Sequence, residues 1–123
     1  MLVYIAGPMT GIRQWNFPEF DEARDELIKL GHVVISPADM DRAAGFDPAN
    51  LPDDWNWSMT PSSFNVDAAI DRDIAAVRRC DAVYMLGGWE SSLGAFAERA
   101  LAKWCRKPIY CKYDFPPSNI LRS

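Results

Sequence analysis

The sequence of 123 residues has little of what metal sites and disulfide frameworks need. It contains one histidine, His32, and three cysteines, Cys80, Cys105 and Cys111, without any Cys-x-x-Cys spacing. A zinc site needs several such ligands at short spacings, and an odd number of cysteines cannot all pair within one chain. We therefore expect no metal site and read the cysteines as buried free thiols, as in a protein of the reducing cytoplasm.

Long apolar runs and an excess of positive charge are missing as well. No apolar run approaches the ~18 residues of a membrane-spanning helix, and the first residues lack the basic region of a secretion signal. The formal net charge of -4 argues against binding long nucleic acids by phosphate neutralisation. We expect a cytoplasmic protein that binds neither membranes nor long nucleic acids, although local donors could still hold a small anion.

Strands and helices are predicted to alternate along the chain. Apolar, β-branched runs with the length of buried strands occupy residues 2–6, 32–35, 82–86 and 108–112. Apolar residues at helical spacing occupy residues 16–30, 66–80 and 92–107. This alternation predicts one α/β domain over residues 1–123, with a doubly wound, flavodoxin- or Rossmann-like parallel sheet flanked by helices. Residues 37–65 lack a clear period and are predicted to form a long loop with at most a helical turn.

The first predicted helix has recognisable start and stop signals. Asn16 with Glu19 three residues later resembles a capping box, and Pro18 falls in the first turn, where proline is tolerated. Gly31 follows the last apolar position of the helix. These signals predict that Asn16 caps the helix with its side chain.

Glycine-containing loops follow the first and third predicted strands. They are Gly7-Pro8-Met9-Thr10-Gly11 and Gly87-Gly88. In doubly wound sheets ligands bind beyond the carboxyl ends of the strands, so we expect the ligand site at this edge, beside the helix that begins near Ser92. The predicted substrate-binding residues are Gly7, Met9, Thr10, Gly11, Gly88, Trp89, Ser92 and Gly94.

Two acidic residues break the pattern of their own helices. Glu98 shares its helical face with Gly94, Ala95, Leu101 and Ala102, and none of these can pair with a carboxylate. The small residues one turn towards the N-terminus leave open space above Glu98, because side chains on a helix lean that way. The pattern predicts that a ligand could occupy this space.

Asp73 repeats the anomaly on the preceding helix. Ala69, Ile70, Ala76 and Val77 stand at helical spacing from it, and we place it within an apolar stripe with Ile70, Ile74 and Val77. An unpaired charge in such a setting is costly, so the carboxyl must be neutralised, hydrogen-bonded or hydrated. From the pattern alone, a structural role for both acids is about as well supported as a catalytic one.

Several segments resemble the nucleoside 2-deoxyribosyltransferase-like superfamily, including its small deoxynucleoside 5'-monophosphate N-glycosidases. The similar pieces are Asp73, Cys80-Asp81-Ala82-Val83, Ser92-Leu93-Gly94-Ala95-Phe96-Ala97-Glu98 and Pro108-Ile109. The opening Tyr4-Ile5-Ala6-Gly7-Pro8-Met9-Thr10-Gly11 and Asn16-Phe17-Pro18 resemble a phage and bacterial group assigned to the same superfamily. The resemblance spans most of the chain, except residues 37–65.

The resemblance implies a role for each candidate catalytic residue and for Ser92. Glu98 is the expected nucleophile that attacks C1' of the sugar, Asp73 assists proton transfer to the departing base, and Tyr4 orients Glu98. A tyrosine at position 4 would otherwise simply belong to the core. Ser92 is typical of the hydrolases that act on monophosphates, whereas transferases of free nucleosides have aspartate there. Pro8 departs from the serine of the hydrolases, which leaves part of the phosphate cradle in doubt.

Aromatic residues and the C-terminal tail complete the expected site. Trp55, Trp57 and Trp89 could stack on a base or could instead pack the loop or a subunit interface. The resemblance implies a homodimer or higher homo-oligomer in which a neighbour's tail completes the pocket, and Ser118 and Asn119 are the candidates. No metal or organic cofactor is required.

These observations favour one function over two alternatives. The leading hypothesis is an N-glycosidase or 2-deoxyribosyltransferase that cleaves the base–sugar bond of a (deoxy)nucleoside 5'-monophosphate through a covalent intermediate on Glu98. The first alternative is a nucleotide-binding or sensing module of the same fold without turnover. The second is an interaction domain whose tryptophans cover a partner. The sequence leaves open which base is recognised, which sugar is accepted, and whether water or a second base takes the sugar.

Overall fold

The computed structural model describes residues 1–52, 55–56, 60–61 and 64–111. A parallel sheet of four strands in the order β2-β1-β3-β4 forms its centre. The strands are β1 (Leu2–Ala6), β2 (Val33–Ile35), β3 (Ala82–Met85) and β4 (Ile109–Cys111). The predicted single-sheet α/β fold with parallel strands and flanking helices is therefore confirmed.

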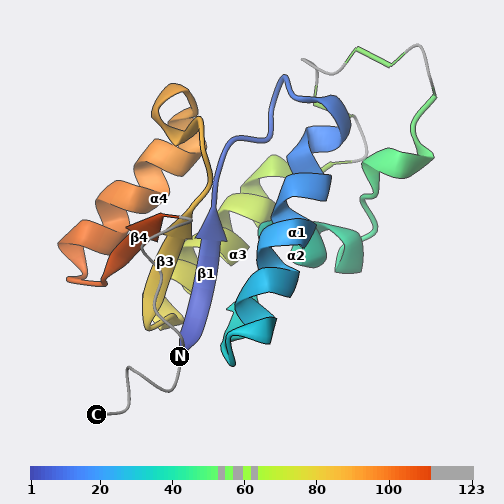
Figure 1. Ribbon diagram of the computed structural model, residues 1–123. Helices are drawn as coiled ribbons and strands as arrows, with labels where there is room; N and C mark the ends of the chain where they lie inside the picture. The colour runs from blue at the N-terminus through green and yellow to red at the C-terminus, as the bar shows by residue number, and fades with distance from the viewer. Residues whose placement is uncertain (53–54, 57–59, 62–63, 112–123) are drawn as a thin grey trace.

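Helices cover both faces of this sheet. The α-helices are α1 (Phe17–Lys29), α2 (Pro37–Ala43), α3 (Val66–Arg79) and α4 (Leu93–Trp104). Short 3-10 turns are η1 (Arg13–Asn16), η2 (Pro48–Asn50) and η3 (Trp89–Ser91). In Figure 1, α1 lies in front of the sheet and α3 behind it, with α4 beside β3 and β4. No helix in the described ranges is both long and apolar enough to cross a membrane.

Strand β1 distributes its side chains between the two faces of the sheet. Val3 and Ile5 join a core cluster with Phe20 and Leu27 of α1, while Tyr4 and Ala6 join a second cluster with residues of α3 and α4. Val3, Tyr4, Ile5 and Ala6 are all fully buried. Because successive side chains of a strand point to opposite faces, Tyr4 is directed to the face that also receives the two predicted acids.

The strand order creates a reversal point between β1 and β3. From β1 the chain first adds β2 on one side, then crosses to add β3 and β4 on the other. The loops after β1 and β3 therefore leave the same sheet edge in opposite directions, and such a switch point is where doubly wound sheets bind ligands. The carboxyl end of β1, marked by its arrowhead, points to the top of Figure 1.

Gly7 is required where these two loops diverge. A Cβ atom at this position would lie 2.7 Å from Cβ of Leu86 and 2.9 Å from its Cδ1. Real Cβ atoms essentially never approach this closely, so only glycine lets the chain leave β1 beside the end of β3.

The segment after β2 differs from its prediction. Residues 37–43 form helix α2 directly after the strand, which is more than the single helical turn predicted for this loop. Ser36 and Pro37 were interpreted only as a strand stop, but proline at the first position also favours the start of a helix. Trp57 and the tail with Ser118 and Asn119 lie outside the described residues, so the predictions for them remain untested.

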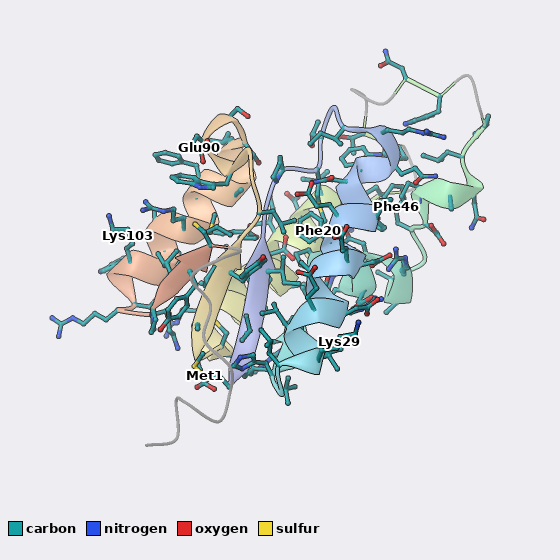
Figure 2. All side chains as sticks on the ribbon, viewed as in Figure 1. Met1, Phe20, Lys29, Phe46, Glu90 and Lys103 are labelled. Atoms are coloured by element: carbon teal, nitrogen blue, oxygen red, sulfur yellow. The ribbon has the colours of Figure 1, made fainter. Side chains whose placement is uncertain are left out.

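The predicted capping box at Asn16 is wrong. Asn16 precedes α1 in the left-handed backbone region, and its side chain makes no capping hydrogen bond to the helix. Its Nδ2 instead donates to the carbonyl oxygen of Pro8, 3.0 Å away. The tertiary contact with the loop after β1 has replaced the local cap. Figure 2 shows Phe20 of this helix beside the sheet, with Lys29 near the far end of the helix.

Two further expectations about burial need correction. Ile70 and Ile74 of α3 are 48% and 45% exposed, because the buried face of this helix consists of Ala69, Ala76 and Val77. Of the cysteines, all free, only Cys80 is buried. The small buried residues of α3 allow the helix to approach the sheet closely and leave its isoleucines outside.

Candidate active site

A hollow lies at the switch point, where the loop after β1 meets the beginning of α4. Its volume is about 160 Å³, similar to the roughly 150 Å³ of an engineered protein cavity that binds benzene. Among its lining residues are these predicted site residues: Gly7, Met9, Thr10, Asp73, Ser92, Gly94 and Glu98. The hollow therefore brings together acids from α3 and α4, as the sequence analysis expected.

Tyr4 of strand β1 forms a hydrogen bond to Glu98. The Tyr4 hydroxyl donates a hydrogen bond to Oε2 of Glu98 over 2.5 Å, across 94 positions of sequence. Tyr4 is fully buried and does not itself line the hollow. Tyr4 therefore contacts Glu98 from strand β1, while Glu98 itself lines the hollow.

Asp73 supplies the second carboxyl group of the hollow. It projects from α3 between the buried residues Ala69 and Ala76 of the same helical face. Its Oδ1 is buried without a hydrogen-bond partner. The carboxyl group of Asp73 lies within hydrogen-bonding reach of Glu98, so a proton shared by the two acids, or a donor on a ligand, can satisfy the unpaired oxygen.

The electrostatic setting favours the protonated form of both acids. Burial, followed by the negative charge of Asp73, raises the pKa of Glu98 to about 8, and the hydrogen bond from Tyr4 opposes this rise. Burial, followed by the charge of Asp41, raises the pKa of Asp73 to about 7, and the charge of Arg72 opposes it. Because neighbouring like charges resist double ionisation, the pair retains a proton near neutral pH.

The pKa of Tyr4 is also raised. Burial is the main cause, and the negative charge of Glu98 adds to it. The phenol thus stays protonated at neutral pH and remains a hydrogen-bond donor. A donor that cannot ionise is well suited to hold a carboxylate in one orientation.

The beginning of α4 forms a polar wall of the hollow. Oγ of Ser92 accepts a hydrogen bond from the backbone amide of Ala95 over 3.2 Å and so caps the helix. The Ser92 hydroxyl can still donate to a ligand. Amides in the first turn of a helix have no partner within the helix and favour an anion. Gly94 leaves open space here, since a Cβ atom would meet nothing within 4 Å.

Other predicted residues are placed elsewhere. Gly11, Gly88 and Trp89 are not among the residues that line the hollow. The ring of Trp89 instead lies beside Phe96, with the guanidinium of Arg99 4.5 Å from the ring centroid. Trp89 is thus occupied by contacts within the η3–α4 corner, and its stacking on a base remains a prediction without geometric support.

Sequence reasoning missed two polar residues of the hollow. Asp41 of α2 and Trp15 of η1 both line it, and both are almost completely buried. The Ser36-Pro37 helix-start signal could have indicated α2 and therefore a defined face for Asp41. No local signal identifies Trp15, because its position depends on a left-handed backbone turn.

The charge of the hollow is entirely acidic in the part of the chain that the structure describes. Its charged lining residues are Asp41, Asp73 and Glu98. No grouping of three or more histidine, cysteine or acidic side chains suited to a metal ion occurs among the described residues. Any anionic part of a ligand must therefore rely on hydroxyls, backbone amides and the dipole of α4, and the acids suit a neutral or positively charged centre.

Comparisons with known proteins support the fold. The chain is similar to the solved structure of 2-deoxyribosyltransferase from the psychrotolerant bacterium Bacillus psychrosaccharolyticus, with a TM-score of 0.62 and 17% sequence identity. The match covers 90% of this chain and 71% of that chain. It agrees with the resemblance found in the sequence at the level of fold, while the narrower likeness to monophosphate hydrolases stays a prediction.

Matching at the level of sequence is more limited. No curated protein matches the chain. A family model described as a domain of unknown function, DUF4406, matches residues 1–111. Because this match covers most of the sequence, the chain belongs to the DUF4406 family.

Proposed function

We propose that this protein cleaves or exchanges the N-glycosidic bond of a (deoxy)nucleoside 5'-monophosphate, as an N-glycosidase or a 2-deoxyribosyltransferase. The observation that carries the proposal is the convergence of Glu98 and Asp73 in one hollow, with the Tyr4 hydroxyl hydrogen-bonded to Glu98. Paired carboxyls serve this reaction because one stabilises or attacks the sugar carbon while the other handles protons. The likeness in fold to a 2-deoxyribosyltransferase supports the same reaction class.

In the first step, a carboxylate oxygen of Glu98 forms a bond to C1' of the sugar. The C1'–N bond breaks, its electron pair stays on the base nitrogen, and the base takes up the proton held by Asp73. The product is a glycosyl ester on Glu98 and a neutral free base. Such covalent catalysis divides one difficult displacement into two easier ones.

In the second step, an acceptor attacks C1' of the ester. If water is the acceptor, Asp73 takes its proton, the C1'–O bond to Glu98 breaks, and the free sugar phosphate leaves. If a second base is the acceptor, the same proton movement yields a new nucleotide. Both outcomes return Glu98 to its ionised form and Asp73 to its protonated form.

The shared proton of the acid pair has to lie on Asp73 when the reaction begins. Burial raises the pKa of both acids, so Glu98 has to be ionised in the substrate complex while Asp73 keeps the proton. The Tyr4 hydrogen bond favours ionised Glu98. A sugar centre that gains positive charge favours it further, because opposite charges attract strongly in a poorly solvated site.

We propose that the phosphate of the substrate binds at the N-terminus of α4. Ser92 and the free amides of the first turn can provide donors there, and Thr10 of the loop after β1 lines the same hollow. Neutral donors and a helix dipole can bind a phosphate without a cationic side chain. This arrangement fits serine rather than aspartate at position 92.

Self-association is also part of the proposal. Large apolar side chains are exposed on α3 and α4, which pack against each other: Val66, Ile70, Ile74, Leu93, Phe96 and Trp104. Leu93 is 86% and Trp104 84% exposed. Val66 and Ile70 also line the hollow, so a second copy of the chain on this apolar surface would cover the open side of the site. Sedimentation of wild type and of Trp104→Glu tests this, with a dimer expected only for wild type.

The direct test of the reaction is release of free base from a panel of deoxynucleoside 5'-monophosphates, followed by chromatography. Wild type should release base from at least one of them, and Glu98→Gln should reduce the rate by at least ~10³-fold, about 4 kcal/mol on the barrier. Glu90→Gln is the matched control, because Glu90 is an exposed glutamate of η3. Mass spectrometry of wild type quenched during turnover should detect a glycosyl adduct on the peptide with Glu98.

Each alternative function gives a different result in this test. Saturable binding of a monophosphate without product after long incubation would support a nucleotide-binding module instead. Absence of both binding and turnover would support an interaction domain. Equal rates for wild type and Glu98→Gln would rule out Glu98 as the nucleophile.

A further inference from the structure

The hollow has lining residues that the proposed reaction does not use. Besides Glu98, Asp73 and the start of α4, it is lined by Trp15, Phe20, Phe64 and Pro37. A flat, apolar ring is the part of a nucleotide that suits such surroundings.

Trp15 contributes a buried donor without a partner. The residue is only 4% exposed, and its ring packs edge-on against Phe46 at 5.8 Å and beside Phe64 at 6.0 Å between centroids. These contacts fix the ring, yet Nε1 is buried with no hydrogen-bond partner. Buried donors are seldom left unpaired because the lost hydration is not replaced. The residue lines the hollow, so a ligand acceptor can satisfy this donor.

The backbone around Trp15 is held in an unfavourable conformation. Gln14, Trp15 and Asn16 have φ angles of 53°, 54° and 60°, in the left-handed region that disfavours residues with side chains. The Asn16 side chain ties this turn to the carbonyl oxygen of Pro8. Such strain persists only where the surrounding structure imposes it, and it is concentrated at functional sites.

Asp41 contributes the matching acceptor. Its side chain is 5% exposed, and Oδ1 forms an ion pair with Nη2 of Arg72 at 3.1 Å. A carboxylate offers about four acceptor positions, so this pair leaves capacity for a further donor. Asp41 lines the same hollow as Trp15.

We propose that Trp15 and Asp41 recognise the base, and that the site prefers a base with an exocyclic amino group beside a ring nitrogen, such as cytosine or adenine. The indole N–H donates to the ring nitrogen, and the Asp41 carboxylate accepts from the amino group. The oxo counterparts uracil and hypoxanthine exchange donor and acceptor at these two positions. They would place a carbonyl oxygen against the carboxylate and an N–H against the indole.

This inference rests on the proposed function for the identity of the ligand, but it is tested by binding rather than by turnover. Calorimetry of the full chain carrying Glu98→Gln measures affinity without cleavage. The probes are two pairs of deoxynucleoside 5'-monophosphates that differ in the amino or oxo group. The first pair is the deoxycytidine and deoxyuridine monophosphates, and the second is the deoxyadenosine and deoxyinosine monophosphates. In the pair whose ring size fits the hollow, the amino member should bind at least about tenfold more tightly than the oxo member.

Two substitutions in the same background identify the residues responsible. Trp15→Phe keeps an aromatic ring and removes only the donor, and should weaken binding of the amino member about tenfold or more. Asp41→Asn replaces a pure acceptor by an amide that can also donate, and should abolish most of the amino-over-oxo preference. Asp71→Asn, at an exposed aspartate of α3, is the control and should change neither quantity.

The outcomes separate this inference from the reaction. Equal or stronger binding of the oxo members, unchanged binding in Trp15→Phe, or no binding of any probe would overturn the inference. If Asp41→Asn does not fold because Arg72 loses its partner, Trp15→Phe still decides. Amino-specific binding without any release of base from wild type would retain the inference and remove the proposed reaction. Release of base by wild type, together with equal binding of the amino and oxo members, would retain the proposed reaction and remove the inference.

Discussion

The two faces of the sheet are filled in different ways. Towards α1, the buried helix residues are mostly large and apolar, such as Phe17, Phe20 and Leu27. Towards α3 and α4, the buried helix residues are mostly alanines, such as Ala76 and Ala102. Tyr4 and the acidic pair occupy the room that these small residues leave. One face therefore supplies the stability of the fold, while the other accommodates titratable groups.

The largest effect that tests this division is expected in the α1 face. Leu27→Ala should lower the free energy of unfolding by about 3 kcal/mol, because Leu27 is 2% exposed and a cavity would remain. Urea unfolding measures this loss. The neighbouring Ile28, 53% exposed, is the control, and Ile28→Ala should change stability by no more than about 0.5 kcal/mol. The rate of base release per folded molecule should be the same in both variants.

On the other face, a substitution in the acidic pair should raise the free energy of unfolding instead of lowering it. Raised pKa values of buried acids contribute stability that is complete at low pH and is lost as pH rises through the folded pKa, about 8 for Glu98. Glu98→Gln removes this loss and should stabilise the protein by about 2 kcal/mol at pH 9, with little gain at pH 4. Urea unfolding at both pH values provides the test. Equal gains at both would show that Glu98 is not buried as an acid.

A pair of tyrosines on opposite faces sharpens the comparison. Tyr4→Phe removes the donor to Glu98 and should reduce kcat/KM about 30-fold, a change of about 2 kcal/mol. The lower limb of the pH–rate profile should move to higher pH, because ionised Glu98 loses its stabilising hydrogen bond. Tyr84, equally buried in the cluster on the α1 side, is the control. If Tyr84→Phe has the same effect on kcat/KM, the role assigned to Tyr4 is wrong.

The smallest effect concerns the helix caps of α3 and α4. Ser92→Ala should cost about 1 kcal/mol of stability, because the cap to the Ala95 amide is lost. It should also raise KM for a monophosphate more than for the free nucleoside. Asn65, which caps α3 through the Ala68 amide at 3.0 Å, provides the comparison. Asn65→Ala should lower stability similarly and leave KM unchanged.

Much of the fold follows from local patterns. The β-branched runs and helical periods predicted β1, α1, α3, β3 and α4 because each buries one well-defined face or is buried on both. The same periodicity predicted that Glu98 and Asp73 face inward. It could not predict that Ile70 and Ile74 lie outside, because the apolar side chains of α3 extend around more of its circumference than the sheet covers.

Other parts of the site depend on contacts between distant residues. Asn16 has the composition of a helix cap, yet its side chain bonds to Pro8 and the turn before it adopts left-handed geometry. Trp15 reaches the hollow only through that turn. Asp41 lies on a short helix whose start signal was equally consistent with the end of a strand. The residues proposed to recognise the base were therefore harder to predict than those proposed to perform the chemistry.

The tight fit of Gly7 against Leu86 has a practical meaning for engineering. A methyl group at position 7 would collide with the Leu86 side chain, so the chain beyond the ends of β1 and β3 would have to shift. Changes in the proposed substrate preference are therefore better sought at Trp15 and Asp41 than at Gly7. A library that varies those positions and keeps glycine at 7 would test the proposed recognition while leaving the approach of Gly7 to Leu86 intact.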